Sequence, residues 1–210
     1  MYKEGILVVV SGFSGAGKGT IMKQLMKTYD NYALSVSATT RKPREGEVHG
    51  REYFFVTVEE FEKKIAEGEL IEYAKYVDNY YGTPTDFVME QRRMGKDVIL
   101  EIEIQGALKV KEKYPDTLLL FVLPPSAATL KERLIGRGTE ELSVIEARLK
   151  RAEKEAEGVE AYDYVLVNDD LDKCVREMHE TIQAQHRKTS NYLPLIEQIR
   201  AELKEQKGEL

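Results

Sequence analysis

The sequence predicts an α/β fold in which a three-layer core with a parallel sheet carries an inserted β-rich subdomain and a helical lid. The main observation is that apolar runs alternate with helical patterns, as they do where crossover helices connect parallel strands. The apolar runs are residues 6–10, 98–102, 118–123 and 164–167. A second observation is the glycine-rich loop between the first run and the first helical pattern. Residues 35–83 and 127–157 interrupt the alternation, which predicts two additions to the core.

Composition limits the size of the fold and the kind of partner. A chain of 210 residues has room for one α/β domain with small inserted parts. Its 31 Lys and Arg against 37 Asp and Glu give a net charge of -6, so we expect no nucleic-acid partner. No apolar run reaches the ~20 residues of a membrane span, so we expect no membrane partner. Cys174 is the only cysteine, which excludes an internal disulfide and favours a cytoplasmic location.

The glycine-rich loop is the first element with a chemical meaning. It consists of Gly12, Phe13, Ser14, Gly15, Ala16, Gly17, Lys18, Gly19 and Thr20. A glycine-rich turn between a strand and a helix directs backbone N–H groups and the positive end of the helix dipole at an anion. The lysine of such a loop reaches the β- and γ-phosphates of a nucleotide. Two alternatives remain open: a tight turn with a solvated Lys18, or a nucleotide bound for structural or regulatory purposes.

The inserted segment, residues 35–83, shows short alternating patterns at residues 52–56 and 70–77. One polar and one apolar face predict antiparallel strands at both places. Between them, Thr57 and Glu60 form a capping-box pattern, which predicts a helix that ends near Gly68. We therefore expect a small β-rich subdomain that projects from the parallel sheet.

The remaining segments complete the core and add the lid. Residues 118–123 are apolar throughout, which predicts a central strand covered on both faces. Residues 127–157 are rich in charge and predict a helical hairpin, broken at residues 136–138 and capped again at Ser143. We divide the chain into a core of residues 1–34, 84–126 and 158–190, a subdomain of residues 35–83, a lid of residues 127–157 and a C-terminal helical extension of residues 191–210.

A basic turn in the inserted segment suggests a second anion site. Arg41, Lys42 and Arg44 cluster around Pro43, which disfavours a helix there. Guanidinium groups bind phosphate through paired hydrogen bonds, although a basic turn on its own is more often simply solvated. The hydroxyls of Tyr53, Tyr80 and Tyr81 in the same segment could also donate to a phosphate.

Taken together, these segments closely resemble guanylate kinase. The motifs that carry the resemblance are the phosphate loop and residues 35–53, 71–72, 80–83, 101–106, 136–140 and 167–171, all within residues 5–187. The resemblance implies ATP-dependent phosphorylation of GMP, and of dGMP, by direct in-line transfer with Mg²⁺ bound to ATP. Other nucleoside monophosphate kinases share the loop and lid, and a non-catalytic scaffold domain of the same fold is a further alternative.

The resemblance also implies roles for individual residues. Glu72 would accept hydrogen bonds from two guanine donors, with Thr83 and Ser37 in the same pocket. Arg41, Arg44, Tyr53 and Tyr81 would bind the GMP phosphate. Glu101 and Glu103 stand where the family often has aspartates, and their roles stay open between GMP, water-bound Mg²⁺ and a nearby arginine.

On the ATP side, the resemblance assigns catalytic cations to Lys18, Arg137 and Arg148, alongside Arg41 from the GMP side. Asn168 would contact adenine. Gly19 replaces the hydroxyl that commonly binds Mg²⁺, so Thr20 is the only protein ligand suggested for the metal. The sequence leaves open whether the chain forms a homo-oligomer.

Overall fold

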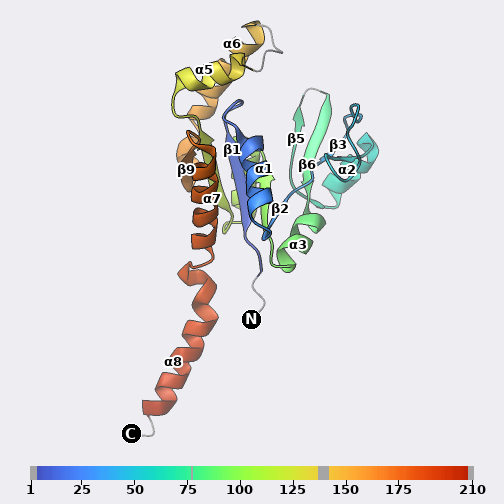
Figure 1. Ribbon diagram of the computed structural model, residues 1–210. Helices are drawn as coiled ribbons and strands as arrows, with labels where there is room; N and C mark the ends of the chain where they lie inside the picture. Colours follow the sequence, from blue (N-terminus) through green and yellow to red (C-terminus); the bar gives the residue numbers. More distant parts are fainter. Residues whose placement is uncertain (1–3, 77, 137–141, 208–210) are drawn as a thin grey trace.

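The computed structural model describes residues 4–76, 78–136 and 142–207 (Figure 1). Its main sheet has the strand order β2-β7-β1-β8-β9, and every neighbouring pair is parallel. The strands are β1 Leu7–Gly12, β2 Tyr32–Leu34, β7 Asp97–Glu101, β8 Leu118–Leu123 and β9 Tyr164–Val167. The predicted parallel sheet is confirmed. The edge strand β2 was not predicted.

Helices cover both faces of this sheet, because the residues of β1 alternate between two apolar clusters. Val8 and Val10 face α1 (Lys18–Thr28) and α7 (Leu171–Gln185). Leu7 and Val9 face α3 (Thr85–Arg93) and α4 (Ile104–Lys113). This alternation confirms the three-layer core. β8 is an interior strand with both faces buried, as predicted, while β1 is the middle strand of the sheet.

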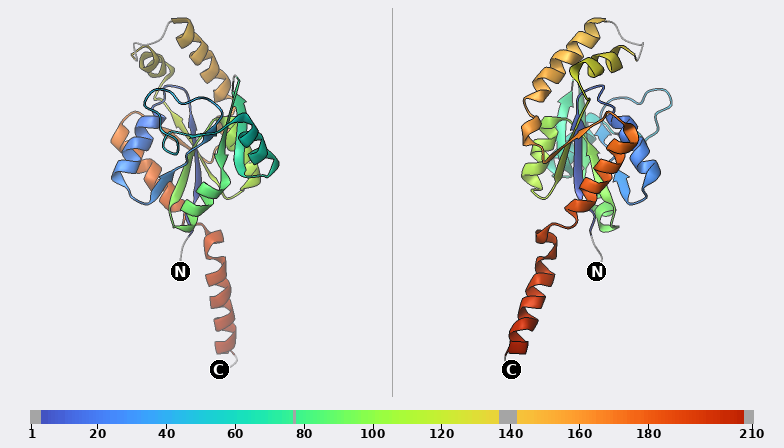
Figure 2. Two further views of the ribbon diagram at one scale, coloured as in Figure 1. Left: turned by 90° about the vertical axis from the view of Figure 1, so that its right-hand side faces the viewer. Right: turned by 60° about the vertical axis from the view of Figure 1, so that its left-hand side comes forward.

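A second sheet, of order β4-β3-β6-β5, lies beside the core (Figure 2). Its strands are β3 Ala38–Thr39, β4 Phe54–Phe55, β5 Leu70–Tyr76 and β6 Asn79–Pro84. β6 is antiparallel to β5 and to β3, but β4 is parallel to β3. The prediction of an antiparallel strand at residues 52–56 was therefore wrong. The long connection after β3 returns the chain to the end at which β3 begins, so β4 runs in the same direction.

Helix α2 (Val58–Ala66) packs on the second sheet and begins as predicted. The Thr57 hydroxyl accepts a hydrogen bond from the Glu60 N–H, and the Glu60 carboxylate accepts one from the Thr57 N–H at 2.8 Å. Phe61 is fully buried and stacks on Tyr80 with ring centroids 5.2 Å apart. These contacts pack α2 and Tyr80 together on one face of the second sheet.

The lid consists of α5 (Ala127–Ile135) and α6 (Leu142–Ala156), which lie beyond the carboxyl end of the main sheet (Figure 1). A small cluster formed by Leu130, Leu134, Ile145 and Ala152 joins the two helices. Ser143 lies inside α6, so the predicted cap at that residue was wrong: the helix already includes Leu142.

The chain ends in a helix that leaves the body of the molecule. After η1 (Val159–Ala161), β9 and α7, the short helix η2 (Thr189–Tyr192) leads into α8 (Leu193–Lys207). α8 projects away from the core at the end opposite the lid (Figures 1 and 2). Among the described residues, no helix combines the length and the apolar content needed to cross a bilayer.

Candidate active site

The phosphate loop connects β1 to α1 in the conformation that the motif requires. Gly17 caps α1 with φ of 93°, a left-handed conformation that favours glycine. A Cβ at this position would also lie 2.4 Å from Nδ2 of Asn168, so a side chain here would displace the Asn168 amide from its hydrogen bond to the Ala16 carbonyl. Gly17 therefore lets the chain turn directly into α1, so that the N-terminus of this helix, with its positive dipole end, lies at the loop.

The side chain of Lys18 folds back over the phosphate loop. Its Nζ donates to the carbonyl oxygens of Gly12 at 2.6 Å and Phe13 at 3.3 Å. Its charge also opposes the rise in the pKa of Glu101, so the ammonium acts on the end of β7 as well. The Lys18 ammonium, bound to the Gly12 carbonyl, thus lies between the phosphate loop and the carboxyl end of β7.

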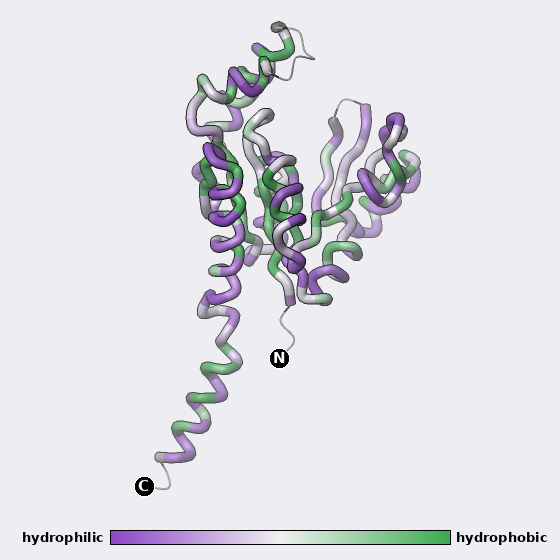
Figure 3. Tube along the Cα trace, in the orientation of Figure 1, coloured by the Kyte–Doolittle hydropathy of each residue, from purple (hydrophilic) through white to green (hydrophobic). Residues whose placement is uncertain are grey.

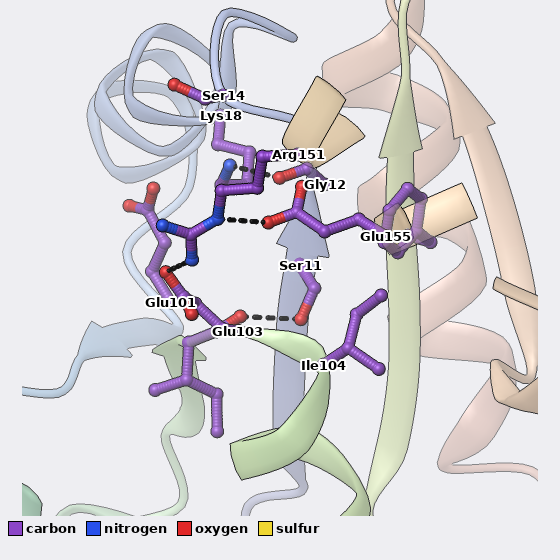
Figure 4. Close-up of a pocket in the computed structure, with 11 residues that line it drawn as sticks. Ser11, Gly12, Ser14, Lys18, Glu101, Glu103, Ile104, Arg151 and Glu155 are labelled. Atoms are coloured by element: carbon purple, nitrogen blue, oxygen red, sulfur yellow. Dashed lines mark hydrogen bonds and ion pairs between the residues drawn. The ribbon is translucent and has the colours of Figure 1, made fainter. Parts of the chain in front are cut away.

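A cavity of about 280 Å³ opens between the phosphate loop and the carboxyl end of β7 (Figure 4). Its polar lining comes from Ser11, Ser14, Lys18, Glu101, Glu103, Arg151 and Glu155. Below it, the Ser11 hydroxyl donates to the Ile102 carbonyl at 2.6 Å, which joins β1 to the segment after β7. The end of a parallel sheet, where strand ends and a helix N-terminus converge, is the usual place for a ligand in this kind of fold.

Glu101 and Glu103 enter this cavity from consecutive elements. Glu101 ends β7, and Glu103 directly precedes α4. Protein atoms packed around the Glu101 carboxyl raise its pKa, although part of its surface is exposed, and Lys18 opposes this shift. Glu103 forms an ion pair with Arg151 of the lid. The two carboxylates therefore face different cations.

Two lid arginines of α6 reach the core. Nη1 of Arg148 lies 3.4 Å from the Ser14 hydroxyl of the phosphate loop. Arg151 pairs with Glu103 and also donates from Nε to Glu155 at 2.9 Å (Figure 4). These contacts place the lid against the phosphate loop and the segment after β7. Arg137, the other predicted lid cation, lies outside the described residues.

A second cavity, of about 290 Å³, flanks the other side of the phosphate loop and is lined in part by Thr20, Arg133 and Asn168. The Asn168 amide donates from Nδ2 to the Ala16 carbonyl at 2.8 Å. Arg133 of α5 donates to the Asn168 carbonyl at 2.9 Å. The loop after β9 is thereby fixed to the phosphate loop.

The basic turn of the second sheet is ordered by a carboxylate. Nη2 of Arg41 lies 2.9 Å from Glu47, whose other oxygen accepts a hydrogen bond from the Arg44 N–H at 2.8 Å. These two donors hold the pKa of Glu47 below its usual range. The Arg41 guanidinium lies 5.4 Å from the centre of the Tyr53 ring, within cation–π range.

Tyr53 and Tyr81 complete this cluster. Their ring centroids are 6.0 Å apart in an edge-to-face arrangement. Burial raises the pKa of the Tyr53 hydroxyl, so it stays a hydrogen-bond donor at neutral pH. Hydrogen bonds to Glu47 and to Tyr81 raise the pKa of Arg41. Tyr80, which the sequence also offered as a candidate, points to the opposite face of β6 and packs in the core of the second sheet.

Glu72 of β5 and Thr83 of β6 meet in a buried pocket. The Thr83 hydroxyl donates to Oε1 of Glu72 at 2.8 Å, and Glu72 is 8% exposed. Burial raises the pKa of Glu72, while the Thr83 hydrogen bond and the charge of Lys109 act in the opposite direction. Ser37 comes directly before β3 of the same sheet, where its carbonyl accepts a hydrogen bond from the Phe54 N–H.

Gly106 of α4 forms a wall of this pocket. A Cβ at Gly106 would lie 3.3 Å from Oε2 of Glu72, a closer contact than side chains usually make. The absence of a side chain therefore leaves the second carboxylate oxygen room beside the first turn of α4. The core and the inserted sheet meet at this contact.

Four residues that contact predicted site residues were not identified from the sequence: Glu47, Gly106, Arg133 and Arg151. Arg133 lies in the charged segment of residues 127–157, which could have indicated it as a further cation of the lid. Arg151 lies in the same segment, but no signal indicated its contact, because its partner Glu103 lies 48 positions away in the chain. Within the described residues, no cluster of His, Cys, Asp or Glu has the arrangement of a metal site.

Comparisons with known proteins agree with the folded arrangement. The family model described as guanylate kinase matches residues 4–185. The chain is similar to the guanylate kinase of Clostridioides difficile, with 50% identity over 96% of this chain and 98% of that one, and to that of Bacillus subtilis, with 47% identity over 92% and 96%. The crystal structure of the Anaplasma phagocytophilum guanylate kinase has 34% identity and a TM-score of 0.70, with 89% of each chain covered. The chain belongs to the guanylate kinase family.

Proposed function

We propose that the chain transfers the γ-phosphoryl group of ATP to GMP, and to dGMP, by direct in-line displacement, with each side of the site serving one nucleotide. The observation that carries this proposal is the pairing of a phosphate loop with a separate sheet that holds both a basic, tyrosine-lined cluster and the buried Glu72–Thr83 pair. A donor site and an acceptor site are what a kinase of small substrates requires.

The acceptor side selects guanine through Glu72. Guanine presents N1–H and the N2 amine as adjacent donors, and an ionised carboxylate accepts from both. The Thr83 hydroxyl fixes Oε1 of Glu72, and Thr83 and Ser37 are the polar groups that we assign to the rest of the base. Adenine presents a lone pair at N1 instead of a donor, so it would face Glu72 with repulsion.

The acceptor phosphate would be bound by Arg41, Arg44, Tyr53 and Tyr81. Glu47 fixes Arg41 and the backbone of Arg44 before any substrate arrives, which reduces the entropy lost on binding. Two guanidinium groups and two phenolic hydroxyls supply enough donors to orient a phosphate oxygen for attack. We assign Glu101 and Glu103 to the border between the two substrates.

The donor side would hold ATP on the phosphate loop, with Lys18 and Thr20 at the phosphates. The transferred group carries charge on its peripheral oxygens in the transition state, and cations stabilise that charge. Lys18, Arg41, Arg137 and Arg148 are the catalytic cations that we assign, and Arg148 already lies near Ser14 of the loop. The cavity beside Asn168 is our assignment for adenine.

The donor set near the loop fits a Mg²⁺ ion that is bound largely by ATP and water. Thr20 is exposed in the first turn of α1 and offers one hydroxyl, while the described residues provide no cluster of carboxylates for a complete metal cage. Mg²⁺ commonly keeps several waters and binds through substrate phosphates. When bound, the ion would neutralise phosphate charge, and the residues above would orient the reactants. We also propose a cytoplasmic location, because the sequence has one cysteine, Cys174, which is a free thiol, as is usual in a reducing compartment.

Substitution of Lys18 tests the proposal directly. We expect Lys18→Ala to lower kcat by about 10²-fold or more, the usual effect of removing one donor to transition-state charge. Lys23→Ala, an exposed lysine on the same helix, is the matched control and should keep wild-type kinetics. A Lys18→Ala enzyme with the wild-type rate would contradict the assigned role of the phosphate loop.

A further inference from the structure

One side of α6 carries charged residues toward the core. Arg148, Arg151 and Glu155 are spaced three and four residues apart, so they share one side of the helix. The neighbouring side holds Ile145 and Ala152, which pack in the lid cluster, and Figure 3 shows apolar and polar residues alternating along the lid. The charged side lies over the cavity beside the phosphate loop, where Arg151 and Glu155 are part of the lining (Figure 4).

Arg151 bridges two carboxylates on different elements. Its Nη2 pairs with Glu103 of the core, and its Nε donates at 2.9 Å to Glu155, which lies one turn further along α6. The contact with Glu155 keeps the guanidinium in one orientation on the helix, from which it reaches across to Glu103 (Figure 4). Arg151 therefore joins the lid to the segment that precedes α4.

This bridge lies between two cavities. Glu103, Arg151 and Glu155 line the cavity of about 280 Å³ beside the phosphate loop, and they also line a neighbouring cavity of about 310 Å³ that includes Gln105 and Lys154. The bridge therefore forms a wall of the site where α6 meets α4.

The position of Arg148 depends on how α6 is docked. Arg148 precedes Arg151 by three residues, or about 4.5 Å along the helix axis. Nη1 of Arg148 lies 3.4 Å from the Ser14 hydroxyl, which is long for a hydrogen bond. Arg151 and Glu103 carry opposite charges, and charge-assisted contacts are the stronger kind. The bridge, more than the Arg148–Ser14 contact, therefore sets the position of this side of the helix.

We propose that Arg151 is a positioning residue for phosphoryl transfer: by bridging Glu155 and Glu103 it docks α6 on the core and thereby places Arg148 at the phosphate loop. This inference rests on the proposed function, in which Arg148 stabilises charge on the transferred group. Two carboxylates neutralise the charge of Arg151, so it acts through Arg148 rather than on a substrate. The side chains of Arg151 and Glu103 are 40% and 69% exposed, so loss of the pair should shift the docking of α6 by about fivefold.

Steady-state kinetics with ATP and GMP test the positioning role. Arg151→Ala should lower kcat by about fivefold and leave the KM for ATP unchanged, because the phosphate loop itself is intact. Lys150→Ala, an exposed residue of the same helix, is the matched control and should keep the wild-type kcat. A wild-type kcat in Arg151→Ala would overturn the proposal.

The double variant Arg148→Ala, Arg151→Ala shows whether the two arginines act together. If Arg151 acts through Arg148, the double variant should have the kcat of Arg148→Ala alone, because the effects of coupled residues do not add. A further fall of about fivefold in the double variant would mean that Arg151 acts independently of Arg148, and the positioning role would be wrong.

Hydrogen exchange without nucleotides tests the docking separately from activity. Glu103→Gln removes the core partner of Arg151 without changing α6, and the amides of residues 142–156 should then exchange about fivefold faster. Glu112→Gln, an exposed carboxylate of α4, is the control and should leave this exchange unchanged. Unchanged exchange in Glu103→Gln would overturn the docking. A wild-type chain that forms no GDP would instead refute the proposed function, and the exchange result would still decide whether Arg151 docks the lid.

Discussion

Replacement of Glu72 by glutamine is the perturbation whose effect follows most directly from the site. The amide oxygen would keep the hydrogen bond from Thr83, which lies 2.8 Å from Oε1, so the NH₂ group would face guanine. A donor would then meet two guanine donors. A hydrogen bond to a charged group is worth about 1.5–3 kcal/mol, and an unsatisfied buried donor costs about 1–3 kcal/mol. We expect a net loss of about 3 kcal/mol, or roughly 100-fold in kcat/KM for GMP.

A coupled assay with each nucleotide varied in turn measures this loss. The KM for ATP should not change, because Glu72 lies in the inserted sheet rather than on the phosphate loop. Glu62→Gln, an exposed carboxylate of α2 in the same subdomain, is the matched control. Wild-type kinetics toward GMP in Glu72→Gln would refute the guanine pocket.

The melting temperature of Glu72→Gln separates a loss of guanine recognition from misfolding. Burial raises the pKa of Glu72 in the folded chain. The stability contributed by its protonated form is present below the unfolded pKa and is lost as the pH rises through the folded pKa. Glutamine stays neutral, so the melting temperature of Glu72→Gln relative to wild type should increase from acidic to neutral pH. A relative melting temperature that falls over this range would mean that burial does not disfavour the ionised form.

Three further substitutions test separate parts of the structure. Gly106→Ala should raise the KM for GMP by about tenfold, because its Cβ would press on Oε2 of Glu72 and on the Ile102 side chain; an unchanged KM for GMP in steady-state kinetics would argue against this. Arg44→Ala should mainly raise the KM for GMP, whereas Arg148→Ala should mainly lower kcat; identical effects in steady-state kinetics would rule out the division of roles. Thr57→Ala should destabilise the chain by about 1 kcal/mol in urea unfolding through loss of the α2 cap, with kinetics as the control, and an unchanged midpoint would contradict the role of this cap.

The parts of the fold that could be predicted are those with a local signal. The phosphate loop and the α2 cap are each encoded by a few consecutive residues, and the parallel core by apolar runs that alternate with helical patterns. Composition and spacing are therefore enough to predict these parts. β2 and β3 have three and two residues, too few to show a period. The direction of β4 depends on the course of the long connection from β3, which no local pattern specifies.

The site divides in the same way. Lys18 lies in a motif, and Glu72 was assigned from a family resemblance rather than from its surroundings in the sequence. Arg151 and Glu103 meet because α6 folds over the end of β7, and a lid rich in charged residues offers many equivalent candidates for such a pair. Gly106 acts by lacking a side chain beside Glu72, and only the folded distance reveals that role.

The central claim is that a donor site on the phosphate loop serves an acceptor site specific for guanine. The most direct measurement is product formation from ATP and Mg²⁺ with GMP, dGMP, AMP, UMP and CMP, each tested alone. We predict efficient formation of GDP and dGDP, and a kcat/KM for AMP lower by at least about a hundredfold, since each well-formed bidentate contact contributes about 1–3 kcal/mol of discrimination. Equal or better use of AMP would contradict the assignment of Glu72 and Thr83 to guanine.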